Sequence, residues 1–293
     1  MEEDILETGW KSTKLVVNGL SLHVVEAGPS NGPLLILLHG FPEFWWAWRH
    51  QIAPLAKSGY HVLAPDLRGY NLSDAPQEVS SYVLDKLVAD VISLADHYRA
   101  ERFYLAGHDW GGIVAWGVAA SHSNRLERLV IMDAPHPDLF TEDILKHPTQ
   151  ALRSTYVALF QLPWLPEQVL GTLNFAALRS MVEASGRDNA FKPGELQRYA
   201  KAWAQPGSLT AMLNYYRGLR LRKKPDRPAH ILCPTLLLWG EKDSFLEHHV
   251  ARTSLKHCSN GRLYIVKGAT HWLHLEEPAV VNSKIIDFFG SKD

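Results

Sequence analysis

The sequence contains few cysteines, and this scarcity excludes two kinds of scaffold. Two cysteines, Cys233 and Cys258, occur among 293 residues. They are too few to hold a chain of this length together by disulfides, and their spacing matches no cysteine-based metal motif. Reduced thiols in a cytoplasmic protein are the simplest interpretation.

The sequence also lacks a strong net charge and a long hydrophobic run. Its formal net charge at pH 7 is −1, which gives no reason to expect nucleic acid or an anionic membrane as a partner. The apolar run Leu34–Leu38 is far too short to cross a bilayer. The acidic start Met1–Asp4 is unlike a basic secretory signal. We therefore expect neither a nucleic acid nor a membrane partner, and the sequence does not indicate an oligomeric state.

What the chain does contain is a regular alternation of short apolar runs and helical stretches. Its first two extended segments flank Asn18-Gly19, a dipeptide typical of a hairpin turn. Six later runs are mainly apolar, as in strands buried inside a parallel sheet. These runs lie at 34–38, 60–65, 103–107, 129–132, 235–240 and 263–266, and helical stretches such as 86–97 and 110–120 separate them. The pattern predicts an α/β fold with a mostly parallel sheet and a leading antiparallel hairpin.

The alternation stops after Asp133 and resumes at Thr235. Between these residues the chain has helical periodicity and many prolines but no convincing strand. A helical insertion between two core strands explains this change, and such an insertion could cover an active site as a cap. We therefore predict a core formed by residues 1–134 and 230–293, with a helical cap at 135–229.

One segment combines the features of a nucleophile elbow. Gly107-His108-Asp109-Trp110-Gly111-Gly112 follows an apolar run and begins a helix. Glycines two residues before and after Asp109 have the spacing of the G-x-S-x-G elbow, with aspartate in the place of serine. The sharp turn needs small neighbours, and a helix N-terminus favours an anion. An aspartate here is otherwise a simple helix N-cap; the strand, the glycines and the partners described next favour a nucleophile.

The partners of this nucleophile are expected later in the chain, an acid first and then a histidine. Asp243 follows the apolar run that ends at Gly240, and His271 follows the next predicted strand. At the carboxyl ends of neighbouring strands, Asp243 could orient His271, and His271 could take a proton from water. His274 is the alternative base, but it lies deeper in the following helix.

The loop His39-Gly40-Phe41-Pro42 follows the first of the six apolar runs. With an elbow of this type, an oxyanion hole takes one backbone N–H from this loop and one from the residue after the nucleophile. The N–H groups of Phe41 and Trp110 are therefore the candidate donors. Pro42 has no N–H and can only shape the loop.

An aspartate nucleophile indicates displacement at a saturated carbon. Its attack leaves an ester on Asp109, which water activated by His271 can cleave. The leaving group can be an epoxide oxygen or a halide, and only the epoxide oxygen needs a proton donor. Tyr156, Tyr215 and Tyr216 lie on apolar helical faces of the insertion, where they suit either packing or proton donation to an alkoxide. Their spacing does not choose between Tyr215 and Tyr216.

Together these motifs resemble the soluble epoxide hydrolases of the α/β-hydrolase superfamily, from about residue 13 to the C-terminus. The resemblance lies in His39-Gly40-Phe41-Pro42, Gly107 to Gly112, Tyr156 with Phe160-Gln161, Asn214-Tyr215-Tyr216-Arg217, Glu241-Lys242-Asp243 and His271-Trp272. It implies an α/β-hydrolase core with a helical cap, and an enzyme that converts epoxides to vicinal diols. It also implies that Asp109 is the nucleophile, His271 the base and Asp243 the acid that orients it.

The same resemblance assigns the remaining residues. Tyr156 and Tyr216 would bind and protonate the epoxide oxygen, while His39, Pro42 and Trp110 would contribute to the substrate site. The implied partners are a small epoxide and water, with no cofactor and no metal.

Three other functions are possible on the same scaffold. Haloalkane dehalogenases share the Asp–Trp elbow but tend to have asparagine where this chain has Phe41. Fluoroacetate dehalogenases carry arginines after the aspartate, whereas this chain continues with Trp110-Gly111-Gly112-Ile113. A catalytically silent ligand-binding protein of this fold would show a broken triad, whereas Asp109, Asp243 and His271 are all present.

Overall fold

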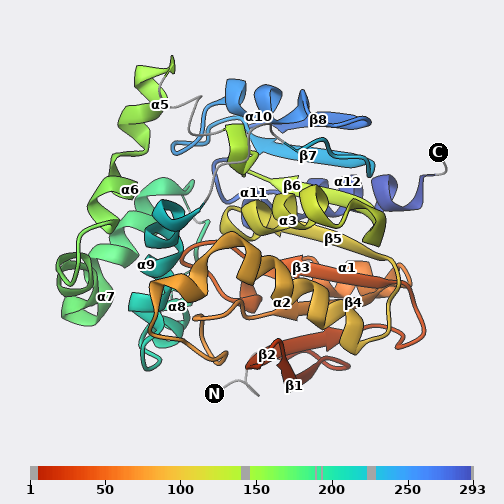
Figure 1. The fold of residues 1–293 in the computed structure, drawn as a ribbon, viewed down its shortest axis with the longest axis horizontal. Coiled ribbons are helices and arrows are strands. Elements are labelled where there is room, and N and C mark those ends of the chain that lie inside the picture. The colour runs from red at the N-terminus through yellow and green to blue at the C-terminus, as the bar shows by residue number, and fades with distance from the viewer. Residues whose placement is uncertain (1–5, 140–145, 189, 193, 223–228, 292–293) are drawn as a thin grey trace.

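In the described part of the chain, eight strands form a sheet in the order β1-β2-β4-β3-β5-β6-β7-β8 (Figure 1). The computed structural model describes residues 6–139, 146–188, 190–192, 194–222 and 229–291. The strands are β1 (Lys11–Val17), β2 (Leu20–Ala27), β3 (Leu34–Leu38), β4 (His61–Pro65), β5 (Phe103–His108), β6 (Leu126–Met132), β7 (Thr235–Gly240) and β8 (Gly261–Val266). β1–β2 and β2–β4 pair antiparallel, and the remaining neighbours pair parallel. The predicted mostly parallel sheet with a leading hairpin is confirmed.

Helices cover both faces of this sheet, which explains why its central strands are apolar. Every residue of β3 and β4 is buried, and each fully buried Leu or Val contributes roughly 1.5–3 kcal/mol. The core helices are α1 (Ile52–Lys57), α2 (Leu84–His97), α3 (Trp110–Ser121), α10 (His248–Leu255), α11 (Leu273–Glu276) and α12 (Pro278–Gly290), with 3-10 helices η2 (Trp45–Trp48), η3 (Val79–Tyr82) and η4 (Ser123–Arg125). α2 packs against α3 in front of the sheet in Figure 1, and α1 packs against α12.

At their starts, β1 and β6 extend beyond the apolar part of each strand. β1 starts at Lys11, which lies opposite Glu26 in the ladder. β6 starts at Leu126, which lies opposite Phe103. Backbone hydrogen bonds extend strands through charged residues such as Lys11, Glu127 and Arg128, so hydrophobicity alone misses these positions.

The chain between β6 and β7 is helical in its described residues. It forms α5 (Pro148–Arg153), α6 (Thr155–Phe160), α7 (Leu165–Ser185), α8 (Glu195–Trp203), α9 (Ser208–Gly218) and the 3-10 helix η5 (Leu219–Leu221). These helices gather at one end of the sheet, on the left of Figure 1. Of the predicted insertion 135–229, residues 140–145, 189, 193 and 223–228 lie outside the described residues.

Side-chain hydrogen bonds tie these helices to the core. The Trp203 indole N–H donates to the Pro42 carbonyl oxygen at 2.5 Å, and the Ser208 hydroxyl donates to that of Gly69 at 2.8 Å. α8 and α9 are thereby held over the loops that follow β3 and β4. Across the described ranges, every helix is too short or too polar to cross a membrane.

Candidate active site

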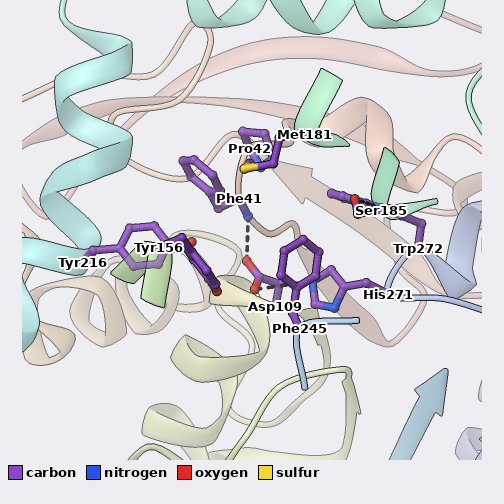
Figure 2. Close-up of a pocket in the computed structure, with 10 residues that line it drawn as sticks. All are labelled: Phe41, Pro42, Asp109, Tyr156, Met181, Ser185, Tyr216, Phe245, His271 and Trp272. Atoms are coloured by element: carbon purple, nitrogen blue, oxygen red, sulfur yellow. Dashed lines mark hydrogen bonds and ion pairs between the residues drawn. The ribbon is translucent and has the colours of Figure 1, made fainter. Parts of the chain in front are cut away.

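Asp109 lies at the turn between β5 and α3, in a backbone conformation that few residues adopt. Its φ is 49° and its ψ is −119°. A positive φ of this kind stores on the order of 1–3 kcal/mol of strain and is concentrated at functional sites. The Asp109 side chain makes no capping hydrogen bond to α3, which removes the simple N-cap interpretation. It faces a cavity instead (Figure 2).

Glycines allow the close packing that this turn requires. A Cβ atom at Gly107 would overlap the Gly111 carbonyl oxygen, and one at Gly111 would overlap the carbonyl oxygen of Leu38. α3 therefore packs directly against β5 and β3. This packing leaves Asp109 at the carboxyl edge of the sheet, as in a nucleophile elbow.

His271 lies between Asp109 and Asp243. Its Nδ1 is 2.8 Å from Asp243 Oδ2, and its Nε2 is 3.6 Å from Asp109 Oδ2. Asp243 Oδ1 accepts the backbone N–H groups of Phe245 and Leu246 at 2.7 and 3.0 Å. The backbone thus fixes the Asp243 carboxylate, which in turn directs Nε2 of the imidazole toward Asp109.

The ionisation of Asp109 and that of His271 depend on each other. Burial alone would raise the pKa of Asp109, but the close approach and charge of His271 hold it below its ordinary value. Burial would lower the pKa of His271, but the charge and hydrogen bond of Asp243 and the nearby charge of Asp109 raise it well above its ordinary value. At neutral pH an ionised Asp109 therefore faces a protonated His271.

One of the two predicted oxyanion donors contacts the Asp109 carboxylate, and the other belongs to the next residue in the chain. The Phe41 N–H donates to Asp109 Oδ1 at 2.8 Å. Trp110 is the first residue of α3, where a helix leaves N–H groups without an intrahelical acceptor. Negative charge that develops on Oδ1 would therefore be stabilised by the Phe41 hydrogen bond and by the N-terminus of α3.

A cavity above Asp109 is lined by residues of the core and of the inserted helices (Figure 2). Its walls are formed by Phe41, Pro42, Asp109, Tyr156, Met181, Ser185, Tyr216, Phe245, His271 and Trp272. Apolar side chains predominate, with a few polar groups converging on one region. Such a site suits a small, mainly apolar molecule with one reactive polar centre.

The structure separates the two adjacent tyrosines that periodicity could not. Tyr156 from α6 and Tyr216 from α9 both line the cavity, and their ring centroids are 5.9 Å apart. The Tyr215 hydroxyl donates instead to the Arg68 carbonyl oxygen at 2.9 Å, in the core. Of the two adjacent phenols, Tyr216 is therefore the one beside Asp109.

Both cavity phenols are protonated at neutral pH. Burial raises the pKa of Tyr156, and the negative charges of Asp109 and Asp243 raise it further. Burial also raises the pKa of Tyr216, with additional contributions from Tyr156 and Asp109. Each phenol therefore carries a proton that it can donate to an oxygen in the cavity.

Two residues expected in the substrate site do not line the cavity. His39 is buried, and its Nε2 accepts the Leu67 N–H at 3.0 Å. Burial lowers its pKa, so a neutral ring supports the loop from within the core. Trp110 lies behind the tyrosines, with its ring edge-on to Tyr216 and 5.1 Å between centroids. Pro42 does line the cavity.

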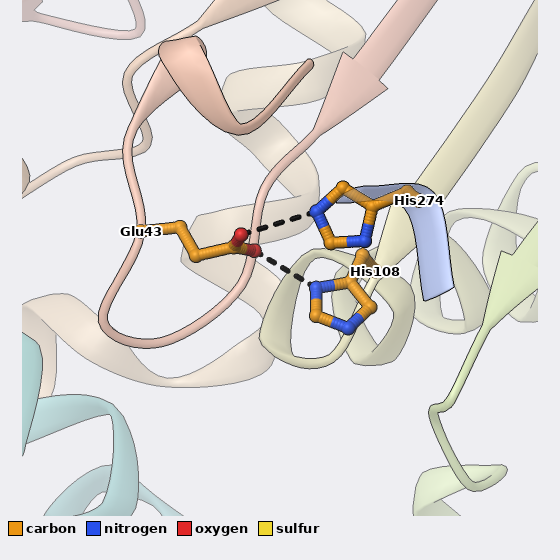
Figure 3. Close-up of side chains that lie close together, drawn as sticks. All are labelled: Glu43, His108 and His274. Atoms are coloured by element: carbon orange, nitrogen blue, oxygen red, sulfur yellow. Dashed lines mark hydrogen bonds and ion pairs between the residues drawn. The ribbon is translucent and has the colours of Figure 1, made fainter. Parts of the chain in front are cut away.

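A second histidine–carboxylate cluster, which the sequence motifs did not reveal, is formed by Glu43, His108 and His274 (Figure 3). Glu43 Oε2 lies 2.8 Å from His108 Nδ1, and Oε1 lies 3.1 Å from His274 Nε2. The His108 Nε2–H donates to the His271 carbonyl oxygen at 2.9 Å, and the Gly40 N–H donates to Glu43 Oε2 at 3.2 Å. The cluster therefore connects the loop after β3, the elbow and the loop that carries His271.

This second cluster is fully buried and asymmetric in charge. Burial would raise the pKa of Glu43, but His274 and His108 hold it well below its ordinary value. Burial lowers the pKa of His274 to about 4 despite the charge of Glu43. Glu43 is therefore an anion and His274 a neutral ring. Glu43, His108 and His274 each lie in or close to one of the sequence motifs. This proximity was the one sequence feature that could have indicated the cluster.

Two groups of described residues bring ligand-type atoms within metal-binding distance of one another. One is Glu43, His108 and His274, and the other is His108, Asp133 and His271. All five side chains are buried. The first group is closed by hydrogen bonds among its own members. We assign a metal to neither group.

Comparisons with known proteins agree with this geometry. A family described as "alpha/beta hydrolase fold" matches residues 33–278. The chain is 43% identical over 284 residues to AB hydrolase superfamily protein YfhM of Bacillus subtilis, covering 97% of this chain and 99% of that protein. It is 39% identical over 277 residues to epoxide hydrolase 4 of Homo sapiens, covering 92% and 76%.

A solved structure shows the same similarity. The epoxide hydrolase of Bacillus megaterium in complex with an inhibitor superimposes with a TM-score of 0.87 at 29% identity, covering 95% of this chain and 100% of that one. Both the sequence matches and the fold thus extend over the core and the inserted helices. The chain belongs to the epoxide hydrolases of the α/β-hydrolase superfamily.

Proposed function

We propose that this protein hydrolyses epoxides to vicinal diols in two steps, through an ester between the substrate and Asp109. Residues 135–229 act as a cap that supplies the proton donors, and the core supplies the nucleophile and base. Water is the second substrate, and the enzyme needs no cofactor or metal for these steps.

In the first step, Asp109 Oδ2 attacks an epoxide carbon and the carbon–oxygen bond opens. The electron pair stays on the epoxide oxygen, which takes a proton from Tyr156 or Tyr216. Because the charge of Asp109 raises the pKa of both phenols, its conversion to a neutral ester makes them stronger acids as the ring opens. Oδ1, bonded to the Phe41 N–H, becomes the ester carbonyl oxygen.

In the second step, water attacks the ester carbonyl carbon. Ester formation removes the Asp109 charge that raises the pKa of His271, so the imidazole releases a proton, and the phenolate left by the first step takes one up. Neutral Nε2 then takes a proton from the attacking water. The Phe41 and Trp110 N–H groups hold the charge on Oδ1, the ester bond breaks, and His271 gives its proton to the departing diol oxygen. The carboxylic acid left on Asp109 then passes its proton to His271, which restores the starting ion pair.

One observation carries the proposal: the Asp109 carboxylate faces His271 in a cavity whose cap side provides two phenols. A halide leaving group would not need these proton donors. Phe41, which packs against Tyr216 with 5.3 Å between ring centroids, stands where a halide-binding asparagine was expected in a dehalogenase. Both features support an epoxide over a haloalkane.

The test is product formation from a styrene oxide-type epoxide and from a 1-haloalkane, with Asp109→Ala as the inactive control. We expect diol from the epoxide, little halide release from the haloalkane, and neither product from the variant. Haloalkane turnover equal to or above epoxide turnover would indicate a dehalogenase. Binding of the epoxide without any turnover would indicate a ligand-binding protein.

A further inference from the structure

Asp133 is a buried carboxyl group beside the triad that the two-step reaction does not use. It follows β6, and Asp243 follows the neighbouring strand β7, which pairs with β6 in parallel from Leu129 to Met132. Both carboxyl groups therefore emerge at the same edge of the sheet, where α/β active sites lie. Asp133 has a φ of 42°, so the chain holds a second aspartate at this edge in a sparsely populated conformation.

The hydrogen bonds of the two aspartates differ. Asp243 has both oxygens occupied, Oδ1 by two backbone N–H groups and Oδ2 by His271. Asp133 Oδ1 accepts the Gly240 N–H at 2.9 Å, but its buried Oδ2 has no hydrogen-bond partner among the described residues. One Asp133 oxygen lies within 4.8 Å of a ring nitrogen of His271 and of His108. A carboxyl group with one unoccupied oxygen thus lies close to the base.

The surroundings of Asp133 favour its neutral form. Burial raises its pKa well above the ordinary value, and the charge of Asp243 raises it further, against weaker opposing effects of His271 and the Gly240 N–H. Ionising both of two adjacent buried carboxyl groups costs a large repulsion energy, so one of the pair retains a proton. The three hydrogen bonds that Asp243 accepts stabilise its ionised form more than the one that Asp133 accepts from Gly240. Asp133 Oδ2 then carries the proton.

We propose that Asp133 and Asp243 form a carboxylic acid–carboxylate pair beneath His271, in which Asp133 is a reserve positioning residue for the base. While Asp243 is charged, Asp133 stays neutral and does not add a second charge next to the imidazole. When the charge of Asp243 is removed, the repulsion that keeps Asp133 protonated disappears. Asp133 then ionises and orients His271 in its place. This inference rests on the proposed two-step function.

Four proteins test the pair: the unaltered enzyme, Asp133→Asn, Asp243→Asn and the double variant. Pre-steady-state kinetics separate ester formation on Asp109 from its hydrolysis. Loss of the orienting charge in a serine protease triad lowers turnover by about 10⁴-fold. With a reserve carboxyl group, Asp243→Asn should slow ester hydrolysis by only about 10- to 100-fold, and the double variant should be as slow as His271→Gln. Asp133→Asn alone should cost a few-fold, because the amide still offers an acceptor to Gly240.

The pH profile distinguishes positioning from a general structural role. In Asp243→Asn, ester hydrolysis should lose rate at low pH as Asp133 takes up its proton, and this additional dependence should be missing from the double variant. Ester formation does not require the His271–Asp243 pair, so its survival in every variant shows that the site is folded; thermal unfolding provides a second check.

Two results would overturn the inference while leaving the proposed function intact. In one, Asp243→Asn hydrolyses the ester as slowly as the double variant. In the other, Asp133→Asn is as damaging as Asp243→Asn. If the unaltered enzyme formed no ester on Asp109, the two-step function itself would be wrong, and the inference would fall with it.

Discussion

The two histidine–carboxylate clusters of this protein contain similar groups in contrasting surroundings. In the first, His271 lies between Asp109 and Asp243 and lines the cavity. In the second, His108 and His274 share Glu43 in a closed part of the core. Burial lowers the pKa of both rings; two carboxylates outweigh it at His271, whereas at His274 the single shared carboxylate does not, and the pKa falls to about 4. The ratio of carboxylates to histidines, together with access to the cavity, decides which ring can exchange protons with a substrate.

The two clusters also contact each other through His108. His108 donates to the His271 carbonyl oxygen, and its ring centroid lies 4.8 Å from that of His271 and 4.4 Å from that of His274. We interpret the first cluster as the reactive one. We interpret the second as a structural one, which fixes the relative positions of the loop after β3, the elbow and the loop that carries His271.

The largest expected difference is between His271→Gln and His274→Gln, a matched pair on the two clusters. His271→Gln should reduce turnover by about 10³-fold or more and accumulate the Asp109 ester, because hydrolysis loses its base. His274→Gln should cost far less turnover, since its ring does not line the cavity. Turnover assays and intact mass measure both effects. Equal losses in the two variants would remove the distinction between the clusters.

The tyrosines offer a second contrast, between cavity and core. Tyr156→Phe and Tyr216→Phe should each slow ester formation but leave measurable turnover, and the double variant should lose about 10²- to 10⁴-fold, as expected for a missing general acid. Tyr215→Phe is the control, because its hydroxyl bonds the Arg68 carbonyl oxygen away from the cavity. Stopped-flow tryptophan fluorescence would follow ester formation. Normal ester formation in the double variant would reduce both phenols to packing residues.

Sequence reasoning located the reactive cluster but not the structural one. Asp109, Asp243 and His271 each follow an apolar strand, and parallel strands bring their carboxyl ends together. His108 lies inside the elbow motif and Glu43 directly follows His39-Gly40-Phe41-Pro42. Each motif was interpreted through other residues, so nothing local indicated that Glu43 and His108 meet. Their contact depends on how three loops pack, which no periodicity encodes.

The fold and the cavity show the same division. The strands and the helical insertion followed from hydrophobic patterning, because burial on both sheet faces dictates composition. The cavity lining did not follow, since Met181 and Ser185 of α7 meet Phe245 of the segment after β7, and sequence spacing does not determine how these segments pack. Tyr215 and Tyr216 are both buried, which is why an apolar stripe could not distinguish them.

Glu43→Gln should show that the second cluster stabilises the fold, because the variant should have a lower free energy of unfolding. Removing one partner from a buried charged network costs about 3–5 kcal/mol in the free energy of unfolding. The folded-state pKa of Glu43 is lowered, so its stabilisation is complete above the unfolded value near ~4.3 and is lost as pH falls through the folded value. Chemical denaturation between neutral pH and about pH 3 measures both effects. We expect a weaker acid dependence in the variant; an unchanged one would contradict an ionised Glu43.

The smallest expected effect concerns the pH dependence of ester formation. Asp109 must be ionised to attack, and His271 holds its pKa below the ordinary value. The rate of ester formation should therefore persist as pH falls past about 3.9, the ordinary aspartate value, before it declines. Rapid-mixing experiments with brief acid exposure measure this rate. A decline centred above that value would show that burial outweighs His271.

The central claim is that Asp109 carries the substrate as an ester, and oxygen labelling tests it most directly. A single turnover with excess enzyme in heavy-oxygen water, followed by mass spectrometry of the peptide that contains Asp109 and of the diol, locates the incorporated atom. Because water attacks the ester carbonyl carbon and both diol oxygens come from the epoxide and Asp109 Oδ2, the label should enter Asp109 and be missing from the diol. Label in the diol, with none in Asp109, would mean that water attacks the epoxide directly.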